Sequence, residues 1–332
     1  MAERLDLSGG TDCRGVPISY GDQSAIDDLE RALLCALSFR GDAIAITDGI
    51  LAEHPQFIMA HLFKASWLTQ AMETRIYGEM VTALENAGKL AGRANNRELG
   101  HLAAVRAWVN GDFYGAVQIW EDVLTRYPRD LIALQLAHLS HVLLGDITGQ
   151  RDTVARVFPL WDETIAGYEF VLGFYAFGLE ENADYLRAEE MGRQAIAMRP
   201  DNPYAVHAVG HVMEMKGRQQ GGIRFMSDYV GYWGNSNFAN HLWWHTGLFH
   251  LDICEADRVL EIYDCHLRGS GEGERYEELD SSALLWRLKL LEIDTNGRWA
   301  ELADKWAPAA ADTLYAFNDV HAMMAFAAAG HE

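Results

Sequence analysis

A proline followed five residues later by an alanine recurs three times in this chain at an almost constant interval. The three pairs are Pro55 with Ala60, Pro128 with Ala133, and Pro200 with Ala205. Successive prolines are therefore 73 and then 72 residues apart. Proline cannot continue a helix, and a small alanine lets neighbouring helices approach closely. The pattern predicts repeated helical hairpins, each ended by a proline.

The stretches that precede two of these prolines also match each other. Residues 111–128 (GDFYGAVQIWEDVLTRYP) align with residues 183–200 (ADYLRAEEMGRQAIAMRP), which places Ala116 on Ala188. The interval is about two units of the ~34-residue tetratricopeptide repeat, whose unit is a helical hairpin. Proline is scarce and no segment alternates with a period of two, so we expect no strands. The sequence predicts an all-α fold, a tetratricopeptide-like α-solenoid of stacked helical hairpins.

Glycine-rich segments interrupt the helical pattern at two places. Residues 8–21 contain four glycines and one proline, and residues 269–278 read GSGEGERYEE. Such segments mark loops. We predict an irregular leader over residues 1–21, a helical repeat array over 22–268, a flexible loop over 269–278, and terminal helices of the same array over 279–332.

The charge balance excludes some classes of partner. The chain has 48 acidic and 27 basic residues, a formal net charge of −21. A field of this sign repels phosphate backbones and anionic lipids, so we expect neither a nucleic acid nor a membrane as partner. No uncharged apolar run reaches the roughly 18–20 residues of a membrane helix, and the N-terminus lacks a signal-peptide core. The four cysteines have no C-x-x-C spacing, which fits a reducing cytoplasm.

Several longer motifs indicate a more specific family than the general tetratricopeptide repeat. They are Asp152–Trp161 (DTVARVFPLW), Tyr168–Glu180 (YEFVLGFYAFGLE), Val206–Met215 (VHAVGHVMEM), His241–His245 (HLWWH), Tyr263–His266 (YDCH) and Phe317–His321 (FNDVH). With them the chain resembles the tetratricopeptide repeat protein 38 family along almost its whole length. The resemblance implies a helical repeat fold and no particular reaction. Relatives continue into further helices where this sequence ends, so we expect a shortened member or a homo-oligomer that pairs there with a second copy.

Histidines gather on two of the expected helices. The resemblance to the repeat implies that the first helix of each hairpin lines a concave surface. After Pro200, the next helix carries His207 and His211 one turn apart, and the following first helix carries His241 and His245 with the same spacing. Imidazoles one turn apart on neighbouring helices can bind one divalent transition metal, with zinc as the first choice. We predict these four histidines as metal ligands.

Further residues complete the predicted site. Glu214 follows His211 on the same helix face, and Asp319 and His321 begin a later helix, so these three are the predicted catalytic groups. The predicted substrate-binding residues are Tyr175, Trp243, Trp244 and His138. Each histidine has a structural alternative, because a buried imidazole often bonds only to a neighbouring carbonyl or carboxylate.

Two functions follow from this pattern. The first is a small-molecule enzyme, a metal-dependent hydrolase with a histidine-rich pocket on the concave face, because a bound metal acidifies water and polarises a carbonyl. The alternative is a non-catalytic module that binds a peptide or protein in the groove, with structural histidines. The inner positions are rich in histidine and poor in lysine, which favours the enzyme. Motifs of phosphate loops and of serine hydrolases are missing from the sequence.

Overall fold

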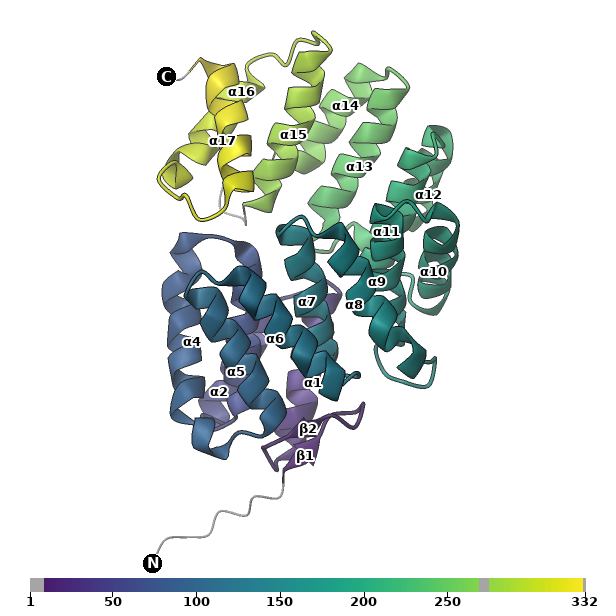
Figure 1. Cartoon of the computed structure of the whole chain (residues 1–332). Coiled ribbons are helices and arrows are strands. Elements are labelled where there is room, and N and C mark those ends of the chain that lie inside the picture. Colours follow the sequence, from purple (N-terminus) through teal and green to yellow (C-terminus); the bar gives the residue numbers. More distant parts are fainter. Residues whose placement is uncertain (1–8, 269–274, 331–332) are drawn as a thin grey trace, which may run out of the picture. The chain divides into compact units, whose positions relative to one another are not determined.

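The computed structural model describes residues 9–268 and 275–330, and helices make up nearly all of their regular structure (Figure 1). In chain order the α-helices are α1 (Gln23–Leu37), α2 (Ala43–Glu53), α3 (Ile58–Leu68), α4 (Tyr77–Lys89), α5 (Asn96–Val109), α6 (Phe113–Arg126), α7 (Leu131–Leu143), α8 (Ile147–Val157), α9 (Tyr168–Glu181), α10 (Tyr185–Met198), α11 (Pro203–Met215), α12 (Gln219–Trp233), α13 (Ala239–Asp252), α14 (Ala256–Ile262), α15 (Tyr276–Leu290), α16 (Arg298–Trp306) and α17 (Ala316–Ala329). The predicted all-α fold of stacked helical hairpins is confirmed.

The proline register sets the helix boundaries. Helices α2, α6 and α10 each end two residues before one of the three repeated prolines, and α3, α7 and α11 each begin three residues after it. The alanines that follow are completely buried at Ala60, Ala133 and Ala205. A methyl side chain at these points lets the backbones of adjacent helices approach closely. The sequence pattern therefore places both the ends of the helices and their contact points.

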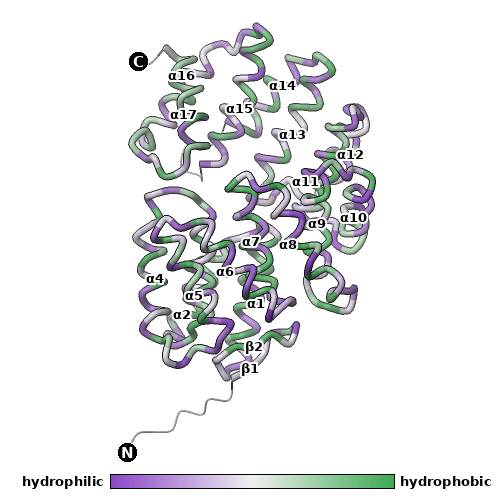
Figure 2. Tube along the Cα trace, in the orientation of Figure 1, coloured by the Kyte–Doolittle hydropathy of each residue, from purple (hydrophilic) through white to green (hydrophobic). Residues whose placement is uncertain are grey.

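Many helices carry both hydrophobic and hydrophilic residues (Figure 2). In α1, α6 and α16 the hydrophobic residues gather on one buried face, which is the pattern of amphipathic helices. In the part of the chain that the structure describes, every helix is too short or too polar to cross a membrane.

The expectation of no strands is wrong at residues 10–18, which form a short β-hairpin. Strand β1 (Gly10–Thr11) pairs antiparallel with β2 (Pro17–Ile18). The Asp12 carboxylate accepts hydrogen bonds from the backbone N–H groups of Arg14 and Val16, each at 2.9 Å. The Arg14 guanidinium in turn binds Glu30 of α1 at 2.6 and 2.7 Å. Side-chain bonds of this kind fix a turn without any period-two pattern.

Contacts divide the described chain into two compact units. The first comprises residues 9–70 and 76–208, and the second comprises 71–75 together with 209–268 and 275–330. The division falls within α11, whose first six residues count with the first unit.

The first unit closes on itself. The segment after α1 contacts the connection between α10 and α11: Arg40 lies 3.4 Å from Asp201, and the ring of Phe39 lies 5.6 Å from that of Tyr204. Helix α7 is buried on every face over Leu131–His138. Helix α7 therefore lies inside the packed core of this unit.

The core of the second unit lies among α13 to α17 and includes Leu284, Leu288 and Trp306. A π-helical turn, Tyr263–Leu267, extends α14. Of the predicted flexible loop, residues 269–274 lie outside the described residues. Glu277 and Glu278 belong to the first turn of α15 instead, and burial raises the pKa of Glu278 to about 7.

Candidate metal centre

Three histidines of the second unit converge from two helices. His241 and His245 lie one turn apart on α13, and their ring centroids are 4.8 Å apart. His211 on α11 brings its ring to 4.5 Å from that of His245. His245 is 1% exposed, whereas His211 and His241 are partly exposed.

His207 lies one turn before His211 on the same helix, and its ring also packs on Phe177 with centroids 4.7 Å apart. One ligand atom from each of His207, His211, His241 and His245 lies within 4.8 Å of those of the other three. We call these four residues the four-histidine centre. The structure thus brings together the four residues predicted as metal ligands.

Two carboxylates hold the rings of the α13 histidines. Asp280 of α15 lies 2.9 Å from Nδ1 of His241, and Glu214 of α11 lies 3.2 Å from Nδ1 of His245. A carboxylate accepts a hydrogen bond from a ring N–H, so it fixes the tautomer in which Nε2 carries the lone pair. Both Nε2 atoms are thereby set up as ligands.

The two Nε2 atoms face each other at 3.3 Å. Two lone pairs at this distance repel unless a cation lies between them, and that cation is either a proton or a metal ion. Two nitrogens bound to one tetrahedral zinc at 2.0–2.1 Å lie about 3.3–3.4 Å apart. The observed separation fits a shared zinc ion.

The two tryptophans of α13 have different neighbours. The ring of Trp244 stacks on that of His241, with centroids 5.3 Å apart, and meets His245 edge-on at 4.7 Å. Trp243 instead stacks on His266 at 3.7 Å and meets Trp233 at 5.2 Å. Trp244 is therefore part of the surroundings of the centre, whereas Trp243 packs against other aromatic rings.

Among the predicted catalytic residues, Glu214 contacts the centre directly as the partner of His245. His321 is not among the four histidines, since its Nδ1 donates to the carbonyl oxygen of Phe317 at 2.8 Å. Burial lowers its pKa, and the nearby charge of Asp280 opposes that shift. Asp319, two residues earlier in the first turn of α17, likewise lies outside the cluster.

Tyr175 and His138, predicted to bind substrate, have partners within the first unit. The Tyr175 hydroxyl accepts a hydrogen bond from Arg187 at 2.9 Å. His138 is buried against Phe174, with ring centroids 5.1 Å apart, and its Nδ1 lies 3.3 Å from the carbonyl oxygen of Gln150. Burial lowers the pKa of His138 to about 3, so the ring is neutral at physiological pH. Both side chains have the contacts of packed structural residues.

Sequence reasoning did not identify Asp280. One signal could have found it: Asp280, Ser281 and Ser282 form a polar triplet at the start of an apolar helix, and all three are buried. Buried polar groups in such a place need partners. Asp280 finds its partners in His241 and in Asn240, whose amide donates to it at 3.1 Å.

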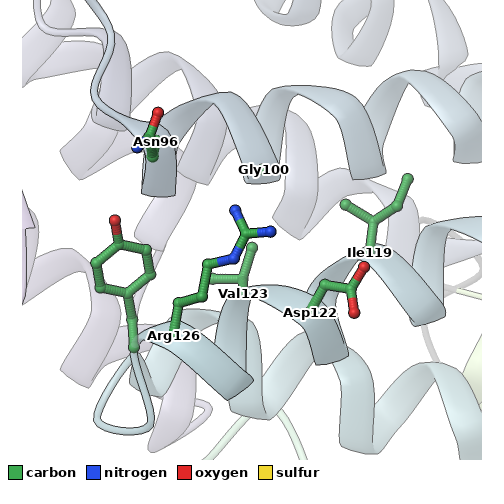
Figure 3. A pocket seen from close by; sticks show the side chains of 7 residues that line it. Asn96, Gly100, Ile119, Asp122, Val123 and Arg126 are labelled. Atoms are coloured by element: carbon green, nitrogen blue, oxygen red, sulfur yellow. The ribbon is translucent and has the colours of Figure 1, made fainter.

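A depression of about 200 Å³ lies between α5 and α6 (Figure 3). Its lining residues are Asn96, Gly100, Ile119, Asp122, Val123, Arg126 and Tyr127, none of which the sequence predicts as a site residue. Gly100 permits this close helix contact, because a Cβ there would lie 2.4 Å from Cγ2 of Val123. Pockets for small ligands usually measure about 300–1,000 Å³. This depression therefore gives little support to the predicted small-molecule ligand.

Comparison with known proteins defines the fold. No family model matches the chain. The crystal structure of the APC/C hetero-tetramer Cut9–Hcn1 is similar over 92% of this chain, with 14% sequence identity and a TM-score of 0.56, and the chain spans 57% of the length of that protein. A tetratricopeptide repeat protein from Parabacteroides merdae is similar over 82% of this chain and 100% of its own, with 14% identity and a TM-score of 0.49. The chain has a tetratricopeptide-type fold, and likeness at this identity shows the fold alone.

Proposed function

We propose that this chain is a protein-interaction module of the tetratricopeptide type in which one divalent transition metal ion, zinc first, joins α11 to α13. The observation that carries the metal is the 3.3 Å between Nε2 of His241 and Nε2 of His245, with each Nδ1 held by a carboxylate. Four imidazoles would complete a tetrahedral shell around such an ion, and a closed shell is typical of structural rather than catalytic zinc. The tetratricopeptide-type scaffold favours the interaction module over the enzyme.

Elemental analysis of protein purified without a histidine tag tests the metal. We expect close to one equivalent of zinc, or of another transition metal that imidazole binds well, per chain. Replacement by cobalt(II) should then give the intense visible absorption of a tetrahedral site. Metal at background, with no cobalt spectrum, would leave a shared proton between His241 and His245 as the cation.

Single and double variants test whether the histidines act on one ion. We expect His211→Ala and His241→Ala each to remove most of the metal, and the double variant to lose little more, because both changes affect one site. His250→Ala is the matched control: it lies on α13 too, but its Nδ1 pairs with Glu255 at 2.6 Å. A control variant that loses metal equally would show that the loss follows from unfolding.

A metal-dependent hydrolase acting on a small molecule is the second candidate. The observation that favours it is the packing of His207 on Phe177, since three histidines and a water would leave an open position with Glu214 nearby as a base. Hydrolysis of activated esters by metal-loaded protein distinguishes the two. If the chain is an interaction module, we expect no chelator-sensitive turnover. If it is a hydrolase, we expect turnover that a chelator abolishes and that persists in His207→Ala.

Three narrower expectations belong to the same proposal. The quoted motifs support kinship with the tetratricopeptide repeat protein 38 family. The four cysteines are free, which supports a reducing compartment such as the cytoplasm. Self-association would use α17, where Phe317, Val320 and Met323 are each more than half exposed.

A further inference from the structure

Five residues that follow α3 belong by their contacts to the second unit. Residues 71–75 join 209–330 in that unit although the chain on either side of them belongs to the first. Met72 and Glu73 lie between two 3₁₀ turns, Thr69–Ala71 and Thr74–Ile76, and have no regular structure of their own. They are 5% and 3% exposed. A short irregular piece of chain is thus buried on a surface made by the terminal helices.

Three hydrogen bonds hold this segment, and each comes from a different element. The Asn318 amide on α17 donates to the carbonyl oxygen of Met72 at 3.3 Å. The N–H of Thr74 donates to Asp312, in the loop before α17, at 2.8 Å. The N–H of Arg275, at the N-terminus of α15, donates to the Glu73 carboxylate at 3.2 Å. We call Arg275, Asp312 and Asn318 the terminal clamp.

The terminal clamp binds the segment through the kinds of contact that peptide-binding sites make with peptides. Two of its bonds involve main-chain groups, which any peptide offers, and in the third a helix N-terminus donates to a carboxylate. Met72 has a φ of +50°, a left-handed conformation that is uncommon for a residue with a long side chain. The Arg75 guanidinium also binds the Glu73 carboxylate, so a local ion pair and contacts with the surface together hold the segment in place.

We propose that the terminal clamp is a binding surface for a short glutamate-containing peptide of a partner protein, and that Met72–Thr74 occupy it as a built-in ligand. This inference rests on the proposed interaction function and specifies the partner: an irregular, turn-like segment whose glutamate is flanked by main-chain groups that can form hydrogen bonds. The partner's glutamate takes the position of Glu73 at Arg275. The preceding carbonyl then accepts from Asn318, and the following N–H donates to Asp312.

The test uses a fluorescent, blocked peptide of residues 70–77 (QAMETRIY) and the full-length chain. Fluorescence anisotropy should show about tenfold tighter binding to the double variant Met72→Gly with Glu73→Gly than to the unaltered chain, because the built-in ligand no longer competes. Adding Asn318→Ala to that variant should weaken binding about fivefold or more. Asp319→Ala, at the next position of α17, is the matched control and should change nothing.

Three results would overturn the inference: equal affinity for the opened and unaltered chains, no effect of Asn318→Ala, or equal binding of a peptide with glutamine in place of its glutamate. If circular dichroism shows that the double variant is unfolded, Glu73→Gln keeps the shape of the segment and should still raise affinity about threefold. Metal content in the same samples separates the two proposals. Retained metal without peptide binding contradicts this inference alone, whereas peptide binding without metal contradicts the metal centre alone.

Discussion

Asp280 acts on the four-histidine centre without being a ligand. Its carboxylate accepts a hydrogen bond from Nδ1 of His241 and thereby directs Nε2 of His241 toward Nε2 of His245, where we propose the ion. We predict that Asp280→Asn lowers zinc affinity about 10- to 100-fold, the usual effect of losing such a partner. Competition with a chromogenic chelator measures the change.

The matched control for Asp280 is Asp264→Asn. Asp264 is also in the second unit, but it pairs with Arg298 at 2.6 and 2.9 Å. Its replacement should leave zinc affinity unchanged. Equal losses in the two variants would mean that the effect of Asp280 is a general loss of stability and not the orientation of His241.

His138 should make the protein less stable in acid. Burial lowers its folded-state pKa from 6.5 to about 3, so the unfolded chain binds a proton at pH values where the folded chain does not. Stability therefore falls as the pH drops from about 6.5 toward 3, by about 1.4 kcal/mol per pH unit from this residue. We predict that His138→Phe flattens the slope by this amount in urea unfolding between pH 4 and 6. An unchanged slope would show that the imidazole is hydrated in the folded state.

Helix pairs depend on alanine at their points of contact. Ala116 on α6 and Ala188 on α10 are completely buried. We predict that Ala116→Leu or Ala188→Leu lowers the free energy of unfolding by about 1–3 kcal/mol, because the added atoms force the helices apart. Ala197→Leu, on the exposed face of α10, is the control and should have little effect. Thermal unfolding of the three variants gives the comparison, and unchanged midpoints in the first two would contradict the helix register.

The helices could be predicted from the sequence because their signals are local. Each repeated proline stops a helix within two residues, and each repeated alanine marks a buried contact. The β-hairpin at residues 10–18 could not be found in this way, since the carboxylate of Asp12 and not a period-two pattern fixes it. The docking of residues 71–75 depends on partners as far as 246 residues away, which local sequence propensity cannot reveal.

The candidate site was predictable to a similar extent and for similar reasons. Spacing within a helix puts His207 with His211 and His241 with His245, because 3.6 residues per turn fix which side chains share a face. It does not say which face of α15 meets α13, so Asp280 needed the tertiary structure. For the same reason Asp319 and His321, although on a first helix as predicted, lie outside the cluster.

At the scale of the whole molecule, the formal charge of −21 makes a bound cation favourable in general, so metal uptake alone does not prove a specific centre. A specific ion stabilises the helices it joins by RT ln(1 + [L]/Kd), about 2.7 kcal/mol at 100 times Kd. We predict that a chelator raises hydrogen exchange in peptides from α11 and α13 and leaves those from α5 and α6, in the other unit, unchanged.

The same exchange experiment on His241→Ala gives the control. This variant should show fast exchange in α11 and α13 before the chelator is added and no further change afterwards, because the ion is already lost. A uniform rise across α5, α6, α11 and α13 would indicate cations spread over the acidic surface. Exchange that the chelator does not alter would mean that a proton joins His241 to His245, and the four histidines would then be structural groups of the interaction module.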